Sequence, residues 1–352
     1  MTALVSILIP AHNAQAWIGD AVKSALEQTW PKKEIIIVDD GSTDGTLMTA
    51  RRFESKALKV LTQPRQGASA ARNRALSVAQ GDYIQWLDAD DLLAPDKISE
   101  QLKKTDVSGE SRILQSSAWG TFYFRSRKAR FVPTPLWHDL APVEWLLVKF
   151  NDGVWMNPAV WLLSRKLTEL AGPWDERLSL NDDGEYFARV VACSEEVRFV
   201  NEAKSYYRRV NSGSLSGIVS DKAMQSLYLS TILSTGHLRS MEDSPRTRVA
   251  SIRALQDVLI YFYPENTEIL AQARAFAEEL GGQLPPPSLR GKYFIIKQIL
   301  GWRTARLALR MIPRSRERIW GNWDKLFYNL GNKRFRPSFL TGRLGTSCKS
   351  ET

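Results

Sequence analysis

The acidic cluster Asp88–Asp91 has the clearest chemical use of any short motif in this chain. It follows the apolar run Tyr83–Leu87, which has the length and composition of a buried strand. Mg²⁺ and Mn²⁺ prefer oxygen ligands, and proteins commonly bind a nucleotide diphosphate through a metal shared between one or two carboxylates and the phosphates. The cluster therefore predicts a site for a divalent cation and a nucleotide diphosphate. The alternative is that these carboxylates cap a helix that begins near residue 95.

The residues before this cluster are predicted to alternate between strands and helices. Short runs rich in β-branched or other apolar residues are typical of buried strands, at 5–9, 35–38, 58–61 and 83–87. Apolar residues at helical spacing lie between them, at 18–26, 47–53 and 68–79. Asn13 is the expected N-cap of the first helix. Strands separated by helices imply parallel pairing, so we predict an α/β fold with three layers, α/β/α.

Polar clusters follow three of the predicted strands, at 10–13, 39–44 and 88–91. The carboxyl ends of parallel strands lie at one edge of a sheet, and ligands of α/β proteins bind beyond that edge. We therefore expect the three clusters to form one binding site.

In their order and spacing, these motifs resemble those of inverting glycosyltransferases of family 2, which have the GT-A fold. The matching segments are Ser6–Asn13, Ile37–Asp44, Gly67–Arg74 and Gly81–Asp91. The resemblance covers roughly residues 3–215. It implies a GT-A nucleotide-sugar-binding domain that transfers a sugar from a nucleotide diphosphate donor to an acceptor hydroxyl. His12 departs from the pattern, because the family usually has Tyr at this position.

The resemblance assigns donor binding to residues at the strand ends and in the following helix: Pro10, His12, Asn13, Asp40, Arg72 and Asp88. Asp40 is expected to accept a hydrogen bond from the imide N–H of uracil or thymine, which favours a UDP- or dTDP-linked donor. Its neighbour Asp39 is expected to be structural. Arg72 is expected to contact the phosphates, and the alternative is a surface arginine that is paired with solvent.

The metal site follows from the same resemblance. Asp88 is assigned to the ribose hydroxyls or to the outer shell of the metal, and Asp90 to direct binding of Mg²⁺ or Mn²⁺. A cation in this place would stabilise the negative charge that the nucleotide diphosphate gains as it leaves.

Transfer with inversion also needs a general base for the acceptor hydroxyl. The segment Asp182–Arg189 follows Gly172–Glu176, and both resemble the acceptor half of the family, where an acidic pair opens a helix. On this resemblance Asp183 is the base and Asp182 occupies the place of the customary Glu. Glu185 is a further candidate on the acceptor or phosphate side. The alternative is that Asp182 or Asp183 only caps the helix.

The acceptor is expected to bind beside the aromatic-rich segment 115–161. Aromatic faces pack on the C–H faces of sugars, so Trp119 is a candidate to line a glycan groove, while most of the aromatic residues are expected in the core. The stretch Tyr206–Ser216 resembles the end of the family's catalytic domain, where a polar segment closes over the donor phosphates. Arg208 or Arg209 is expected to make that contact.

Length and composition are ordinary for an enzyme, with 352 residues, 43% hydrophobic and 24% charged. The two cysteines, Cys193 and Cys348, form no metal-binding pattern and suit a reducing cytoplasm. No signal peptide and no run long enough to span a bilayer are recognised, so we expect a cytoplasmic protein. We predict a catalytic domain over 1–215, divided into a nucleotide half (1–105) and an acceptor half (106–215). A helical segment (216–284) and a basic amphipathic tail (285–352) are expected to follow.

Positive charge is concentrated near the C-terminus. Residues 290–352 contain 15 Lys and Arg against 3 Asp and Glu, a net charge of +12 in a chain whose total is +10. Basic residues alternate there with Trp, Phe, Leu and Ile, which predicts a peripheral anchor on the anionic inner face of the plasma membrane. The alternative is that 295–312 is a helix docked on the body with its basic face in water. No nucleic acid is expected as a partner, because no nucleic-acid-binding motif accompanies the charge.

We therefore expect an inverting, metal-dependent glycosyltransferase that acts on a glycan or lipid-linked acceptor in surface polysaccharide or cell-envelope synthesis. A nicotinamide-dependent oxidoreductase would share the α/β pattern, but the first predicted strand ends in Pro10–Asn13 and not in a GxGxxG turn. A non-catalytic module that binds nucleotides or glycans would carry the same motifs and is the alternative.

Overall fold

Four parallel strands and one antiparallel strand form the first sheet of the structure, a computed structural model that describes residues 2–103, 109–209 and 220–333. Their spatial order is β3 (Leu58–Gln63), β2 (Lys33–Asp40), β1 (Val5–Ala11), β4 (Tyr83–Trp86) and the antiparallel β8 (Leu163–Ser164). The strands β1 to β4 end at the same edge, since Ala11 pairs with Asp39 and Asp40 with Gln63. The polar clusters that follow these strands therefore meet at one edge.

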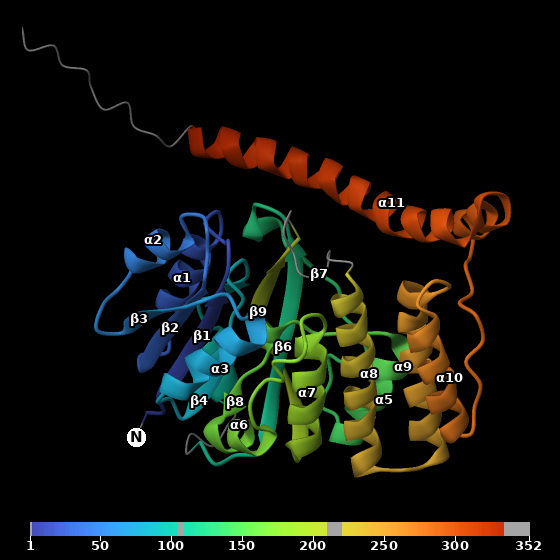
Figure 1. The fold of residues 1–352 in the computed structure, drawn as a ribbon. Helices are drawn as coiled ribbons and strands as arrows, with labels where there is room; N and C mark the ends of the chain where they lie inside the picture. Colours follow the sequence, from blue (N-terminus) through green and yellow to red (C-terminus); the bar gives the residue numbers. More distant parts are fainter. Residues whose placement is uncertain (1, 104–108, 210–219, 334–352) are drawn as a thin grey trace, which may run out of the picture.

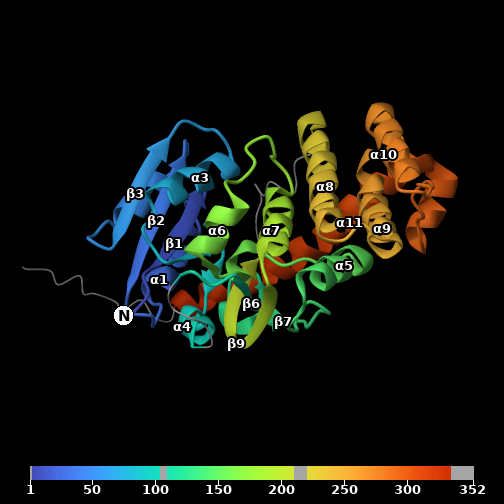
Figure 2. The same cartoon turned by 90° about the horizontal axis from the view of Figure 1, so that it is seen from below.

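Helices cover both faces of this sheet, because successive side chains of a strand point to opposite faces. On β1, Ile7 and Ile9 pack with the buried faces of α1 (Ile18–Leu26), α2 (Thr46–Arg51) and α4 (Lys97–Leu102). Leu8 packs instead with α3 (Ala68–Val78) and α7 (Asp182–Cys193). Figure 1 and Figure 2 show these layers from two directions. The predicted three-layer α/β fold is confirmed.

A second sheet joins the acidic cluster to the later half of the chain. Its order is β5 (Leu92–Leu93), β9 (Glu196–Arg208), β6 (Ile113–Phe122) and β7 (Arg130–Phe131), and the 3-10 turn η1 (Ser126–Lys128) connects β6 to β7. β5 begins directly after Asp91, and Leu92 pairs with Tyr206 near the end of β9. The end of β9 therefore lies beside the acidic cluster.

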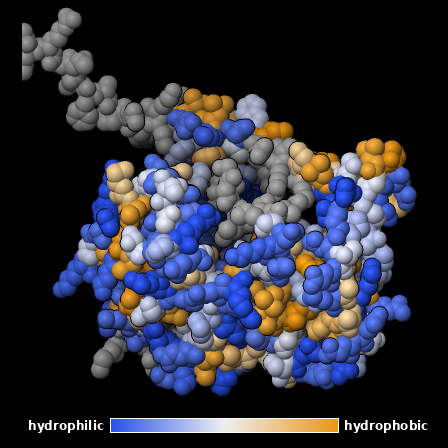
Figure 3. All heavy atoms as spheres, viewed as in Figure 1, coloured by the Kyte–Doolittle hydropathy of each residue, from blue (hydrophilic) through white to orange (hydrophobic). Residues whose placement is uncertain are grey.

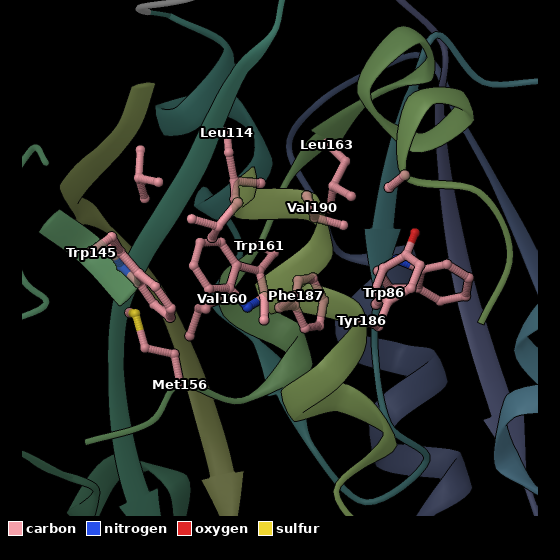
Figure 4. Packing of buried hydrophobic residues seen from close by; sticks show 14 of the residues in the cluster. Trp86, Leu114, Trp145, Met156, Val160, Trp161, Leu163, Tyr186, Phe187 and Val190 are labelled. Carbon is pink, nitrogen blue, oxygen red and sulfur yellow. The ribbon is translucent and has the colours of Figure 1, made fainter. Parts of the chain in front are cut away.

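Aromatic residues fill the core between α7 and the sheets (Figure 4). Trp86 on β4 contacts the ring of Tyr186 on α7 edge to face, and Trp161 stacks on Phe187. Trp145 lies on α5 (Pro142–Asp152), near the turn η2 (Pro158–Val160) and α6 (Arg165–Ala171). Half of the ten aromatic residues of segment 115–161 are buried, whereas we expected most of them in the core: the buried ones are Phe122, Trp137, Trp145, Phe150 and Trp161.

Four helices follow the sheets: α8 (Asp221–Met241), α9 (Pro245–Phe262), α10 (Thr267–Glu279) and α11 (Lys292–Lys333). α8 packs on α7, and α9 packs on α5 and α8. α11 is interrupted at Gly301, which has a φ of 78°, and it crosses above the body in Figure 1. None of the helices in the described ranges is both long and apolar enough to cross a bilayer.

One local prediction and two of the alternatives differ from the structure. Asn13 does not cap α1, which begins at Ile18 with Trp17 as its N-cap. The acidic cluster does not cap a helix either, because α4 begins at Lys97 and its N-cap, Asp96, makes no side-chain cap hydrogen bond. The helix expected over 295–312 extends to Lys333.

Candidate active site

The carboxylates of Asp88–Asp91 are crowded at the carboxyl edge of the first sheet. Oδ1 of the buried Asp91 accepts a hydrogen bond from the backbone N–H of Arg208 at 2.9 Å, and its Oδ2 has no partner among the described residues. Burial raises the pKa of Asp91 well above its ordinary value, and the charges of Asp90 and Asp88 raise it further. This edge is therefore strongly electronegative.

A divalent cation fits this cluster, because positive charge relieves the repulsion between the carboxylates. In the part of the chain that the structure describes, no three His, Cys, Asp or Glu side chains form a complete metal cage. A cation that takes one or two ligands from the protein, and the others from phosphate and water, needs no such cage. Asp90 and Asp88 are the residues that would hold it.

Arg72 connects the acidic cluster to the start of α7. Its Nη2 donates to Asp88 Oδ1 at 2.8 Å and its Nη1 to Asp182 Oδ2 at 2.6 Å. The guanidinium is buried and lies over the ring of Trp174, 4.3 Å from the centroid. Burial alone would lower the pKa of Arg72, but the charges of Asp182 and Asp88 raise it above its ordinary value. The side chain is therefore a buried cation between two acidic sites and not a solvated surface arginine.

Asp183, the predicted base, is partly buried beside Asp182 at the first turn of α7. Burial raises the pKa of its carboxyl, repulsion by Asp182 adds to this, and Arg72 opposes both, with a resulting pKa of about 6. The N-cap of α7 is Asn181, whose φ of 57° is left-handed. Among the described residues, Asp183 Oδ1 accepts a bond from the adjacent Gly184 N–H alone, at 2.9 Å. Helix capping therefore does not account for the acidic pair.

The carboxylate of Asp40 closes the loop between β3 and α3. Its oxygens accept hydrogen bonds from Gln63 Nε2 and from the backbone N–H groups of Gln66 and Gly67, all at 2.8 Å. A carboxylate accepts about four hydrogen bonds, so capacity for one more remains. Its neighbour Asp39, which we expected to be structural, has a buried Oδ1 without a partner among the described residues. Asp39 Oδ2 accepts from the backbone N–H of Ser42 at 3.2 Å, so Asp39 holds the loop after β2, and Asp40 is the residue with capacity for a further bond.

The residues after β1 hold the loop that follows β2. His12 Nδ1 donates to the backbone carbonyl of Asp40 at 2.8 Å. Asn13 Oδ1 accepts from the backbone N–H of Thr43 at 2.9 Å. The backbone N–H of Asn13, which has a left-handed φ of 49°, donates to Ser42 Oγ at 3.0 Å. Pro10 lies just before them at the end of β1. These contacts join the ends of β1 and β2 into one rim.

Arg208 completes the opposite rim. Its guanidinium lies 4.5 Å from the ring centroids of both Trp17 and Phe122, and its Nε donates to the backbone carbonyl of Asp90 at 2.8 Å. Arg209 is exposed, and its backbone N–H donates to Phe122. The rest of the segment expected to close over the phosphates, residues 210–216, lies outside the described residues.

Glu185 points away from this site. Its oxygens bind Arg189 at 2.9 and 3.0 Å, and Oε1 also contacts His237 Nε2 on α8 at 3.0 Å. It lines a separate cavity of about 720 Å³ between the 173–177 loop, α7 and α8. The structure therefore brings together the residues of the acidic cluster, Arg72, Asp182 and Asp183, and leaves Glu185 outside.

Comparison with known proteins identifies the family. The sequence model "Glycosyl transferase family 2" matches residues 6–131. Glycosyltransferase GlyG of Streptococcus pneumoniae is 30% identical over 228 residues, which are 61% of this chain and 73% of that protein. This chain is a family 2 glycosyltransferase.

Other relatives match the transferase over a shorter part. The putative teichuronic acid biosynthesis glycosyltransferase TuaG of Bacillus subtilis is 44% identical over 103 residues, 28% of this chain and 41% of that one. WfgD of Escherichia coli, a UDP-Glc:α-D-GlcNAc-diphosphoundecaprenol β-1,3-glucosyltransferase, is 38% identical over 122 residues, 33% of this chain and 48% of that one. The transferase thus spans less than half the length of TuaG and WfgD.

A solved structure shares the fold of the transferase. TarS of S. aureus, residues 1–349 in complex with UDP-GlcNAc, superposes with a TM-score of 0.56 at 16% identity, over 87% of this chain and 91% of that chain. The GT-A-like sheet followed by C-terminal helices is common to both.

Two features of the site were not identified from the sequence. The unpartnered oxygen of Asp39 depends on loop geometry that adjacent acidic residues do not reveal. Tyr207 and Trp155, which contact the predicted residue Trp119, come from separate segments. Trp155 belongs to the aromatic-rich segment 115–161, and Tyr207 to the stretch Tyr206–Ser216 that we assigned to the donor phosphates.

Proposed function

We propose that this transferase moves a sugar, with inversion, from a UDP- or dTDP-linked donor to a hydroxyl of a glycan or lipid-linked acceptor in cell-surface polysaccharide synthesis. The observation that carries the proposal is the ion-pair bridge from Asp88 through Arg72 to Asp182. This bridge holds the acidic cluster, where the donor would bind, close to Asp183. Donor diphosphate and acceptor base therefore belong to one site.

Asp40 supports a pyrimidine base in the donor. Its carboxylate accepts three hydrogen bonds at the end of β2 and has capacity for one more, which an imide N–H would use. The activity of WfgD, which uses a UDP-sugar donor and a lipid diphosphate acceptor, supports the same pair of substrate classes.

Asp183 is proposed to take the proton of the acceptor hydroxyl as its oxygen attacks the anomeric carbon. The bond from that carbon to the diphosphate breaks on the opposite side, and the nucleoside diphosphate leaves with the electron pair. A base acts best when its pKa lies near the working pH, and burial beside Asp182 raises the pKa of Asp183 to about 6. Arg72, held between the two acidic sites, keeps Asp182 in place.

A divalent cation at Asp90 and Asp88 would supply positive charge to the leaving diphosphate. The crowding of carboxylates around Asp91 supports this assignment. Two arginines already contact this cluster, Arg72 through the Asp88 carboxylate and Arg208 through the Asp90 backbone carbonyl.

Thermal unfolding with a panel of nucleotide diphosphate sugars tests donor binding, because selective binding stabilises the folded state by mass action. We expect one UDP- or dTDP-linked donor to raise Tm with Mn²⁺ and to lose this effect with a chelator. Asp90→Asn should abolish the metal-dependent part, and Asp175→Asn, an acid outside the site, should keep it. A panel without any shift would contradict the proposal. A donor-induced shift without sugar transfer would favour a non-catalytic binding module.

We propose that α11 lies on an anionic membrane surface. Such a position would bring the site close to an acceptor that is anchored in the membrane. The exposed apolar side chains near its end recur at spacings of three and four residues: Ile319, Trp320, Trp323, Leu326, Phe327 and Leu330. Figure 3 shows hydrophobic residues gathered on this end of α11, above the body. The net charge of +12 over residues 290–352 attracts anionic lipid and opposes pairing with a second copy.

α11 docks on the body around Asp324. Of the apolar residues named above, Phe327 also contacts the body, through the guanidinium of Arg125, and is still half exposed. Asp324 accepts hydrogen bonds from the backbone N–H groups of Phe124 and Arg125 at 2.8 and 3.0 Å, and from Arg125 Nε at 2.6 Å. Phe124 in turn contacts Trp17, whose ring lies under Arg208. The membrane-facing helix is therefore two aromatic contacts away from the rim of the donor site.

Vesicle flotation of the full chain tests the membrane proposal. We expect binding to phosphatidylglycerol vesicles, weak binding to phosphatidylcholine vesicles, and loss of binding in the double variant Trp320→Ser and Trp323→Ser. Tyr261→Ser, which removes an exposed aromatic ring from α9, is the matched control. Equal flotation of all variants would contradict the proposal. A second contradicting result would be a dimer that forms without vesicles and is lost in the double variant, because the apolar residues would then bind a second copy of the chain.

A further inference from the structure

Three aromatic rings from separate segments meet beside the proposed catalytic residues. Trp119 on β6, Trp155 after α5 and Tyr207 on β9 lie with ring centroids 4.8 Å (Trp119 to Trp155), 5.9 Å (Trp119 to Tyr207) and 5.4 Å (Trp155 to Tyr207) apart. Trp155 is 42% exposed, whereas Trp145 and Trp161 from the same segment are fully buried. The three rings therefore form an aromatic surface that is open on one side.

Tyr207 places this surface next to the acidic cluster. It directly precedes Arg208, whose backbone N–H is bonded to Asp91 Oδ1. Burial raises the pKa of the Tyr207 phenol, and the charges of Asp91, Asp90, Asp88 and Asp183 raise it further. The phenol thus stays protonated within the field of both the acidic cluster and the proposed base.

Trp155 connects the surface to the acceptor side of the site. It lies just after α5, which packs on α7, the helix that begins with Asp182 and Asp183. The charge of Lys149 on α5 also acts on Asp183. The rings therefore offer apolar faces to a ligand on the acceptor side of the site.

We propose that Trp119, Trp155 and Tyr207 form the acceptor subsite, where a pyranose ring of the acceptor packs its C–H face on the aromatic surface and presents a hydroxyl to Asp183. This inference rests on the proposed function and adds the residues that select the acceptor. The rings take no covalent part. They orient the nucleophilic oxygen, whose proton passes to Asp183 while the sugar leaves the nucleoside diphosphate.

A sugar is the occupant that this surface fits best. An open aromatic face beside charged residues suits a ring that has apolar C–H groups on one side and hydroxyls at its edge. The donor nucleotide is served by other residues, because the rim of Asp39, Asp40 and His12 lies on the first sheet. A lipid chain would need an apolar groove, whereas four carboxylates act on Tyr207.

Steady-state kinetics of full-length Trp155→Ala tests the subsite, with a short-chain GlcNAc-diphosphate-lipid as the acceptor probe and the donor found in the thermal panel. We expect the KM for the acceptor to rise roughly ten-fold and the KM for the donor to stay unchanged, because one aromatic contact with the acceptor is lost. Trp155→Phe should recover most of the acceptor affinity. Tyr261→Ala, another exposed aromatic residue, should match the wild type.

Two results would overturn the inference. A higher KM for the donor with an unchanged KM for the acceptor would assign the rings to the donor sugar, and unchanged values for both would exclude them from binding. A binding measurement keeps this test separate from the proposed function. Saturation-transfer NMR of the acceptor probe without donor should show contacts with the wild type that Trp155→Ala loses. This result does not depend on whether the enzyme transfers a sugar.

Discussion

Arg72 and Asp182 form an ion pair of 2.6 Å although 110 residues separate them in the sequence. The same guanidinium binds Asp88, so one buried cation joins the end of β4 to the start of α7. The distance between the acidic cluster and Asp183 therefore depends on this side chain. The ring of Trp174 packs against the Arg72 guanidinium as a cation–π contact.

Removal of Arg72 is expected to destabilise the fold. Arg72→Ala leaves Asp88 and Asp182 without their buried partner, and the loss of one member of a buried pair costs about 3–5 kcal/mol. Arg177→Ala breaks the exposed pair with Asp175 and should lower the free energy of unfolding much less, because water screens an exposed ion pair. Urea unfolding of both variants measures the difference. Equal and small effects would show that the Arg72 bridge is not a structural link.

The pH dependence of transfer should report Asp183. Its pKa is raised to about 6, and a base accepts a proton only when ionised, so kcat should increase as pH rises through about 6 and then level off. Donor binding, measured by thermal shift, should stay constant over the same range. A kcat that is constant from pH 5 to pH 8 would contradict the assignment.

Stability should change with pH in the opposite direction. The pKa of Asp183 is higher in the folded chain than its ordinary value of 3.8, so the folded state binds the proton more tightly between about pH 4 and pH 6. The contribution of this carboxyl to the free energy of unfolding is therefore largest below pH 4 and falls as pH rises across that window. The difference in unfolding free energy between the wild type and Asp183→Asn, measured from pH 4 to pH 8, should show this fall.

Asp324 is expected to hold the end of α11 on the body. Asp324→Ala leaves the backbone N–H groups of Phe124 and Arg125 without their acceptor, at a local cost of about 1–3 kcal/mol. Hydrogen exchange should become faster at these two amides and along 319–330, while α7 keeps its protection. Asn322→Ala, an exposed position on the same helix, is the control. Unchanged exchange in Asp324→Ala would remove this contact from the account.

The sequence was sufficient to predict the sheet and the convergence of its polar clusters. Alternating strands and helices imply parallel strands, and parallel strands bring Pro10, Asp40 and Asp88 to one edge whatever the later packing. The contacts of Asp40 with residues 63–67 could not be predicted in the same way. They depend on how the loop before α3 folds back, which neighbouring residues in the sequence do not determine.

Long-range packing explains the other differences. The Arg72 bridge exists only because α7 docks beside α3, and no local pattern encodes that docking. Trp145 and Trp155 belong to the same aromatic-rich segment. Trp145 lies on the buried face of α5, whereas Trp155 follows Gly153, which ends α5 with a φ of 61°. The long extent of α11 was also missed, because a proline such as Pro313 usually ends a helix.

The most direct test of the central claim measures sugar transfer by the wild type, Asp183→Asn and Asp175→Asn, with the donor from the thermal panel and the anomeric configuration of the product read by NMR. We predict transfer with inversion by the wild type and by Asp175→Asn. Asp183→Asn should bind the donor normally but lose transfer by at least about a hundred-fold, because it cannot accept the proton. Normal transfer by Asp183→Asn, or a product with retained configuration, would contradict the account.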